Sequence, residues 1–122
     1  MSQTLSSAIA WWARMQPDTV ALCVDGASIT YREYHDWGDR IAVRLMAEGV
    51  RPGDRVAVSG ANSLEYCVLA LGTLRAGAIF CPINMRFTRH EVMEALEDTT
   101  PRLLFCDEER RAKLEGVDAP RR

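Results

Sequence analysis

RVAVSGANSLEYCVLALGTLRAGAIFCPINMR, residues 55–86, is the stretch that decides the fold of this chain. It contains a short apolar run, a nearly all-apolar helical segment and a second short apolar run. Two strands joined by a crossover helix over about thirty residues form a βαβ unit, and its strands must be parallel. Ligands in such folds bind beyond the carboxyl ends of the strands. We therefore look for a site in residues 59–62 and 81–86.

The segment before this unit predicts two helices and a hairpin. Apolar residues at helical spacing predict a helix over residues 4–16, and an Asp-Gly turn predicts an antiparallel hairpin over residues 20–30. Thr30 and Glu33 have the spacing of a capping box, which opens the second helix. One face of that helix is apolar and the other is charged, so we expect the charged face to be solvated.

The segment after the unit continues the same alternation. Thr88 and Glu91 form another capping box, residues 103–106 predict a third parallel strand, and residues 107–110 begin a short polar helix. The order predicts an α/β fold, in which an N-terminal β-hairpin is followed by βαβαβ units. Their strands form a partial doubly wound, mostly parallel sheet with helices on both faces. This sheet would end at an open edge after Cys106, and such an edge favours self-association.

Composition excludes several classes of protein. The 122 residues are 48% hydrophobic and 26% charged, which suits one domain, or one piece of a larger one, with a buried core. A net charge of −2 without a long basic run gives no sign of nucleic-acid binding. The first residues resemble neither a signal peptide nor a membrane span, so we expect a cytoplasmic protein without a transmembrane segment.

The cysteines are expected to be structural. They are widely spaced and lie in apolar segments, with no pattern of zinc ligands. We predict that all four are reduced and buried in the core, namely Cys23, Cys67, Cys81 and Cys106.

Three aromatic or imidazole side chains lie off the predicted apolar stripes. Trp11 lies beside Met15 on the first helix and predicts a second buried face there, in preference to a ring-stacking site. His35 lies among the charged positions of the second helix, so we predict that it is exposed. We also predict that His90 is a surface residue of the helix that follows Thr88.

The residues for familiar enzyme sites are missing. The chain has no phosphate-binding glycine motif and no nucleophile elbow. Arg86 is the best candidate for ligand binding, because it follows a strand end and Pro82 in a loop, where a guanidinium can hold phosphate bidentately. The alternative is a surface arginine paired with a carboxylate such as Glu91, and the residues alone leave both open.

Three motifs, in order, resemble the adenylate-forming enzymes. Residues 29–34, ITYREY, resemble the family's L-T-Y-x-E-L motif, and residues 52–57, PGDRVA, resemble its G-D-R-V-A strand entry. Residues 74–84, LRAGAIFCPIN, resemble its L-K-A-G-A-x-x-x-P-L-N motif. The family contains acyl- and aryl-CoA ligases, luciferases and the adenylation domains of peptide synthetases. The resemblance covers nearly the whole chain, and residues 82–88 resemble a CoA ligase more than a peptide synthetase.

The resemblance implies a two-step reaction and an incomplete chain. In the family, a carboxylate attacks the α-phosphate of ATP, with Mg²⁺, and the thiol of CoA then takes the acyl group. The family's phosphate loop, acyl pocket and catalytic lysine come later in the sequence. Residues 1–122 would thus be the N-terminal portion of the AMP-binding large domain, inactive alone and without tight binding of ATP, Mg²⁺ or CoA. Its partners would be the remaining domains and a small carboxylate substrate.

The resemblance also carries over a site. In some CoA ligases of the family, the arginine of an N-x-R segment contacts a phosphate of CoA, and here that segment is residues 84–86. It implies that Arg86 contacts CoA and that Asn84 shapes the loop. Two alternatives remain: a stand-alone, non-catalytic α/β binding or regulatory module, and one chain of a split adenylate-forming enzyme.

Overall fold

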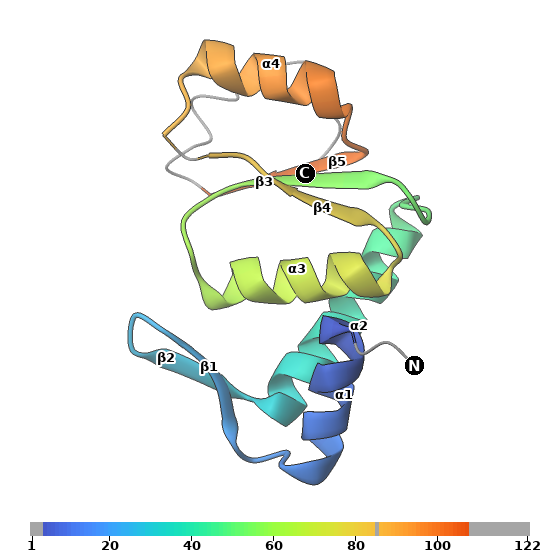
Figure 1. Ribbon diagram of the computed structural model, residues 1–122, viewed down its shortest axis with the longest axis vertical. Coiled ribbons are helices and arrows are strands. Elements are labelled where there is room, and N and C mark those ends of the chain that lie inside the picture. Colours follow the sequence, from blue (N-terminus) through green and yellow to red (C-terminus); the bar gives the residue numbers. More distant parts are fainter. Residues whose placement is uncertain (1–3, 85, 108–122) are drawn as a thin grey trace.

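A computed structural model describes residues 4–84 and 86–107 and confirms the predicted α/β class (Figure 1). The order of helices and strands agrees with the sequence, and boundaries shift by only one or two residues. The elements are α1 (Leu5–Met15), β1 (Val20–Val24), β2 (Ala27–Thr30), α2 (Tyr31–Ala47), β3 (Arg55–Ser59), α3 (Leu64–Arg75), β4 (Ile79–Pro82), α4 (Arg89–Thr99) and β5 (Leu103–Cys106). Residues 108–110 of the predicted polar helix lie outside the described residues.

The strands form two sheets. β1 and β2 make an antiparallel hairpin around Asp25 and Gly26, whose φ angles of 50° and 82° are those of the expected tight turn. The larger sheet is parallel and has the order β4-β3-β5, so that β3 is its central strand. Among the described residues, both β4 and β5 are edges of this sheet, and the predicted open edge at β5 is present.

The crossovers explain why helices cover both faces of the larger sheet. The chain moves from β3 to β4 through α3 and then returns past β3 to β5 through α4. Crossovers between parallel strands are almost always right-handed. Because the chain crosses the sheet in one direction from β3 to β4 and in the other from β4 to β5, the second helix lies on the opposite face from the first. Figure 1 shows α4 on one face of the sheet and α3 on the other.

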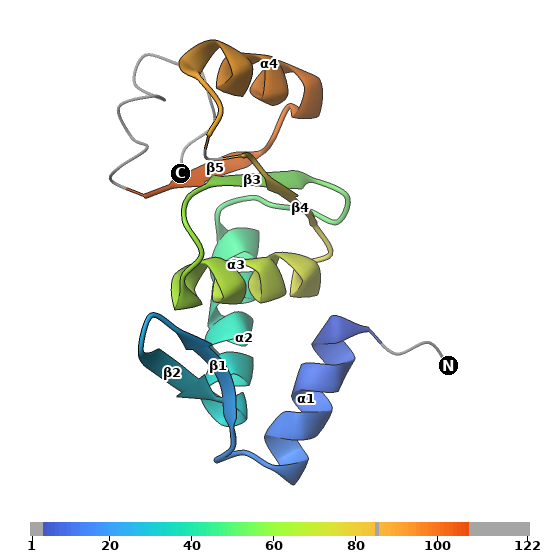
Figure 2. The ribbon, with the colours of Figure 1, turned by 60° about the vertical axis from the view of Figure 1, so that its left-hand side comes forward.

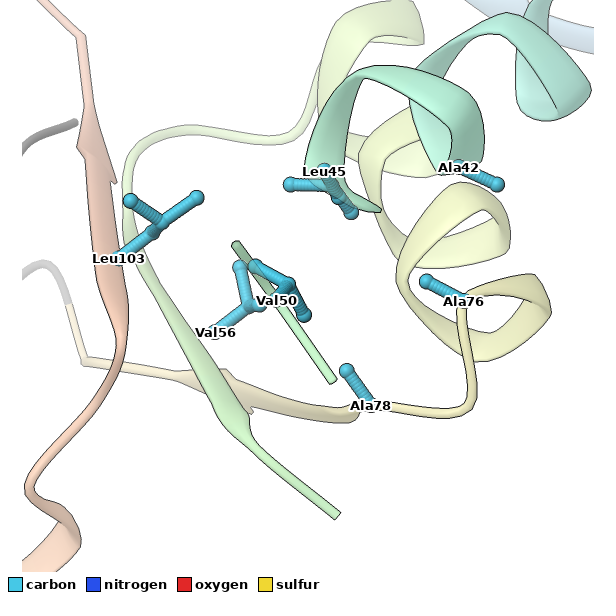
Figure 3. Packing of buried hydrophobic residues seen from close by; sticks show 7 residues of the cluster. All are labelled: Ala42, Leu45, Val50, Val56, Ala76, Ala78 and Leu103. Carbon is cyan, nitrogen blue, oxygen red and sulfur yellow. The ribbon is translucent and has the colours of Figure 1, made fainter. Parts of the chain in front are cut away.

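Side chains alternate between the two faces of the larger sheet, so the core is divided into a cluster on each face. Val56 and Leu103 point towards the α2 and α3 side, where they pack with Leu45 in a cluster that Figure 3 shows between strands and helices. Their neighbours Ala57 and Leu104 belong to the cluster on the α4 side. Residues of β3 from 56 to 59 are all buried, as expected for a central parallel strand covered on both faces.

Two glycines let α2 and α3 pack closely. A Cβ added at Gly72 would overlap the Ile41 side chain, and one added at Gly38 would come within 2.6 Å of Leu71 Cδ2. The predicted apolar stripe of α2 forms this contact. Its buried residues are Tyr34, Gly38, Ala42 and Leu45.

The predicted helix caps are confirmed. Thr30 Oγ1 accepts a hydrogen bond from the Glu33 amide at 3.2 Å, and Glu33 Oε1 accepts one from the Thr30 amide at 2.9 Å. The bond from the Thr30 amide holds the pKa of the Glu33 carboxyl below its usual value. Thr88 and Glu91 make the same reciprocal pair at α4.

Two expectations about burial are wrong. Trp11 and Met15 are 43% and 59% exposed, because α1 lies at the periphery and buries only Ile9 fully (Figure 2). Cys23 is exposed rather than buried, because it faces outward on the two-stranded hairpin. The other three cysteines are partly buried, and all four are free thiols.

Candidate functional site

The carboxyl ends of the three parallel strands bring residues that are distant in sequence to one end of the sheet, which we call its carboxyl edge. β3 leads into Gly60, β4 into Ile83 and β5 into Asp107. This is the edge at which ligands bind in open α/β sheets, and it contains both segments in which a site is expected. The segment after β4 is a hydrogen-bonded loop, and the segment after β3 borders a cleft.

Hydrogen bonds hold the described residues that follow β4. Asn84 Oδ1 accepts a hydrogen bond from the Arg86 amide at 2.9 Å, which is the side-chain-to-backbone bond of an Asx turn. The Asn84 carbonyl accepts a second bond, from the Phe87 amide at 3.0 Å. Ile83 anchors the start of the loop, since it is buried and its amide donates to the Val58 carbonyl at 2.7 Å. The Asn84 side chain therefore binds the backbone at Arg86.

The Arg86 side chain is exposed and makes no ion pair with any carboxylate in the described part of the chain. Glu91, the partner considered from the sequence, turns its carboxylate to the Thr88 amide instead, at 3.1 Å. An exposed guanidinium without a carboxylate partner can bind a phosphate through two parallel hydrogen bonds.

The loop after β3 borders a cleft of about 450 Å³. Asp107 Oδ2 accepts a hydrogen bond from the Ala61 amide at 3.1 Å and so joins the ends of β3 and β5. The cleft walls are largely apolar and come from β3, α3 and β5, through Val58, Tyr66, Leu69 and Phe105. Sequence reasoning missed Asp107 here, because 46 positions separate it from Ala61.

Neither Cys67 nor Cys81 resembles an activated nucleophile. Burial raises the pKa of the Cys67 thiol, which disfavours the reactive thiolate. Cys81 Sγ lies 3.8 Å from its nearest hydrogen-bonding partner, the Ile79 carbonyl, which is not a base. Burial also raises the pKa of the neighbouring Tyr66 hydroxyl.

The two histidines differ from each other in their surroundings. His90 is a surface residue of α4, as predicted, with its side chain 82% exposed and Nε2 2.9 Å from Glu94 Oε1. His35 is not the freely exposed residue that we expected. Its Nδ1 lies 2.9 Å from Nη2 of Arg75, an arginine of α3 whose side chain is 9% exposed. Asp39 also binds Arg75, so the charged face of α2 is only partly solvated.

Neither a metal cluster nor a membrane-spanning helix occurs in the part of the chain that the structure describes. No three His, Cys, Asp or Glu side chains there come together as metal ligands. None of the helices described is both long enough and apolar enough to cross a bilayer.

Comparison with known proteins gives consistent matches. The sequence model of a family described as AMP-binding enzyme matches residues 9–121. The fatty acid–[acyl-carrier-protein] ligase ScoC of Streptomyces coeruleorubidus is 38% identical over 107 residues, which are 88% of this chain and 21% of ScoC. Oxalate–CoA ligase of Arabidopsis thaliana is 36% identical over 110 residues, again 88% of this chain and 21% of that protein.

A solved structure extends the match to three dimensions. The N-terminal domain of FACL13 from Mycobacterium tuberculosis superposes with a TM-score of 0.88 at 26% identity, over 98% of this chain and 32% of that one. The chain therefore spans about a fifth of the length of the two relatives that it matches by sequence.

Proposed function

Because the chain belongs to the family of AMP-binding enzymes, we propose that it forms the N-terminal part of an ATP-dependent acyl-CoA ligase. In this reaction a carboxylate attacks the α-phosphate of ATP and releases pyrophosphate, and the thiol of CoA then displaces AMP from the acyl-adenylate. The match over residues 9–121 carries the proposal. The free cysteines support a location in the cytoplasm, where thiols stay reduced.

The described residues do not fit ATP or Mg²⁺. They contain no cluster of metal ligands and no phosphate-binding glycine loop. We therefore assign binding of ATP and Mg²⁺, and the adenylation step itself, to the rest of the parent enzyme. The 122-residue chain by itself should not form an acyl-adenylate.

The Asn84–Arg86 loop fits one part of the reaction, the binding of a CoA phosphate. The observation that supports this role is an exposed guanidinium without a carboxylate partner among the described residues, on a loop fixed by the Asn84 side chain. The loop also lies at the carboxyl edge of the sheet. In this role Arg86 neutralises phosphate charge and orients CoA, and Asn84 positions the Arg86 backbone.

Arg86→Ala in the complete enzyme is expected to raise the KM for CoA by about tenfold or more, because each hydrogen bond to a charged group contributes about 1.5 kcal/mol or more. The rate of carboxylate-dependent pyrophosphate release should not change, because that step precedes CoA binding. Steady-state kinetics at varied CoA concentrations measure the first effect, and ATP–pyrophosphate exchange measures the second.

Arg51→Ala is the matched control, because Arg51 is exposed but precedes β3 and so lies at the opposite edge of the sheet. This variant should leave both quantities unchanged. An unchanged KM for CoA in Arg86→Ala would remove Arg86 from the CoA site and leave the proposed reaction standing.

A carrier protein is a second candidate for the acyl acceptor. The observation in its favour is the similarity to ScoC, whose name describes an acyl-carrier-protein ligase. A carrier protein delivers its thiol on a phosphopantetheine arm, so a phosphate contact at Arg86 would suit either acceptor.

A further inference from the structure

Two anchors flank Arg86 in the described part of the chain. Before it, the amide of the buried Ile83 donates to the Val58 carbonyl at 2.7 Å, which holds this residue against β3. After it, Phe87 packs, partly buried, against the apolar cluster on the α4 side of the sheet, whose members are Ala57, Ile83, Val92, Leu96 and Leu104. Arg86 therefore lies between the end of β4 and the start of α4, and its place depends on both.

Glu91 holds the start of α4. Its Oε1 accepts a hydrogen bond from the Thr88 amide at 3.1 Å, and its own amide donates to Thr88 Oγ1 at 3.2 Å. The Thr88 carbonyl accepts a further bond, at 2.9 Å, from the amide of Val92, whose side chain is buried. The Glu91 carboxylate thus binds the backbone two residues after Arg86 and ties it to a buried part of the helix.

The packing of α4 is limited, so its first turn depends on this cap. The fully buried residues of α4 are Val92 and Leu96. The first turn of a helix has amides without helical partners, and loss of a cap leaves that turn free to unwind. Unwinding would release the Thr88 amide and loosen the backbone on which Arg86 lies.

The Glu91 carboxylate also leaves the Arg86 guanidinium unpaired. Among the described residues, no ion pair joins the two side chains. A carboxylate bound to Arg86 would compete with a phosphate for the same donors. Because Glu91 binds the Thr88 amide instead, those donors remain open to a ligand.

We propose that Glu91 is a positioning residue for the binding of a CoA phosphate. Its carboxylate holds the backbone that follows Arg86, and it leaves the guanidinium free to bind the phosphate. This role depends on the proposed binding of CoA at Arg86. Glu91 itself touches neither the phosphate nor the reacting atoms, so its effect passes through Arg86.

Glu91→Ala in the complete enzyme should raise the KM for CoA about fivefold, the usual effect of losing a helix cap. ATP–pyrophosphate exchange should not change, because the adenylation step precedes CoA binding. A purely electrostatic role predicts the opposite sign, since removing a negative charge near Arg86 would tighten the binding of an anion. A KM for CoA that stayed the same or fell in Glu91→Ala would overturn the proposal.

Glu91→Gln separates the hydrogen bond from the charge. The glutamine oxygen can accept from the Thr88 amide as the carboxylate does, so the KM for CoA should be no higher than in the unsubstituted enzyme. Glu94→Ala is the matched control, because Glu94 lies on the same helix and pairs with His90 at 2.9 Å, outside the cap. It should leave the KM unchanged. If either variant raised the KM as much as Glu91→Ala, the cap would not be the cause.

A double-mutant cycle shows whether Glu91 acts through Arg86. In the Arg86→Ala background no guanidinium remains to be positioned, so adding Glu91→Ala should not raise the KM for CoA further. Additive increases would overturn the positioning role of Glu91 and leave the CoA contact of Arg86 standing. An unchanged KM in Arg86→Ala alone would instead reject that contact, and with it this role for Glu91.

Discussion

Leu71→Ala is expected to lower the free energy of unfolding by about 2 to 5 kcal/mol, the range for truncating a fully buried leucine. Leu71 has no exposed surface and belongs to the cluster that joins α1, the hairpin, α2 and α3. Its Cδ2 also fills the space left by the missing side chain of Gly38. The cavity created by alanine would thus lie where α3 packs against Gly38 of α2. Urea unfolding followed by circular dichroism measures the change.

Leu74→Ala is the matched control, because Leu74 lies on the same helix and is 44% exposed. Its truncation should cost less than about 1 kcal/mol, as for most surface substitutions. Equal costs for the two variants would mean that α3 does not pack against α2 as described.

Arg75→Met is expected to lower the free energy of unfolding by about 3 kcal/mol, because it removes charged hydrogen bonds from a side chain that is 9% exposed. Methionine retains much of the apolar stem, so the loss reports the guanidinium rather than the packing. The Ser6 and His35 carbonyls would each lose a donor. The free energy of unfolding of Arg75→Lys should lie between those of the unsubstituted protein and Arg75→Met, because an ammonium has three donors where the guanidinium has five.

Arg44→Met is the control for this charge removal. Arg44 is an exposed arginine of α2 that pairs with Glu48 at 3.2 Å, and exposed pairs contribute about 0 to 1 kcal/mol. Denaturant titrations of both variants under one set of conditions compare them. If Arg75→Met lost no more stability than Arg44→Met, the contacts of Arg75 with α1 and α2 would contribute little to stability.

Local signals in the sequence predicted most of the fold, because each of them acts within a few residues. Thr30 with Glu33 and Thr88 with Glu91 identify the starts of two helices by hydrogen bonds that span three positions. Gly26 adopts the positive φ that the predicted hairpin turn requires. Strand order was not predicted, because the pairing of β3 with β5 joins strands on either side of an intervening βα segment. No local motif records that pairing.

The candidate site was predicted in part for the same reason. Asn84 and Arg86 are two positions apart, so their place in a loop after a strand could be inferred from the sequence. Arg75 and His35 are 40 positions apart, and their contact depends on how α2 crosses α3. The one sequence sign of that contact is an arginine at the end of a largely apolar helix. The exposure of Trp11 and Cys23 could not be inferred from the sequence either, because it depends on which elements pack against α1 and the hairpin.

Identification of the acyl acceptor is the most direct test of the central claim that this chain is part of an acyl-CoA ligase. The complete enzyme, supplied with a carboxylate, ATP and Mg²⁺, would be given CoA or an acyl carrier protein, and the products would be analysed by mass spectrometry. The account predicts an acyl-CoA thioester with one AMP and one pyrophosphate released per thioester. Formation of AMP without any acyl-CoA, or acyl transfer to the carrier protein alone, would contradict it.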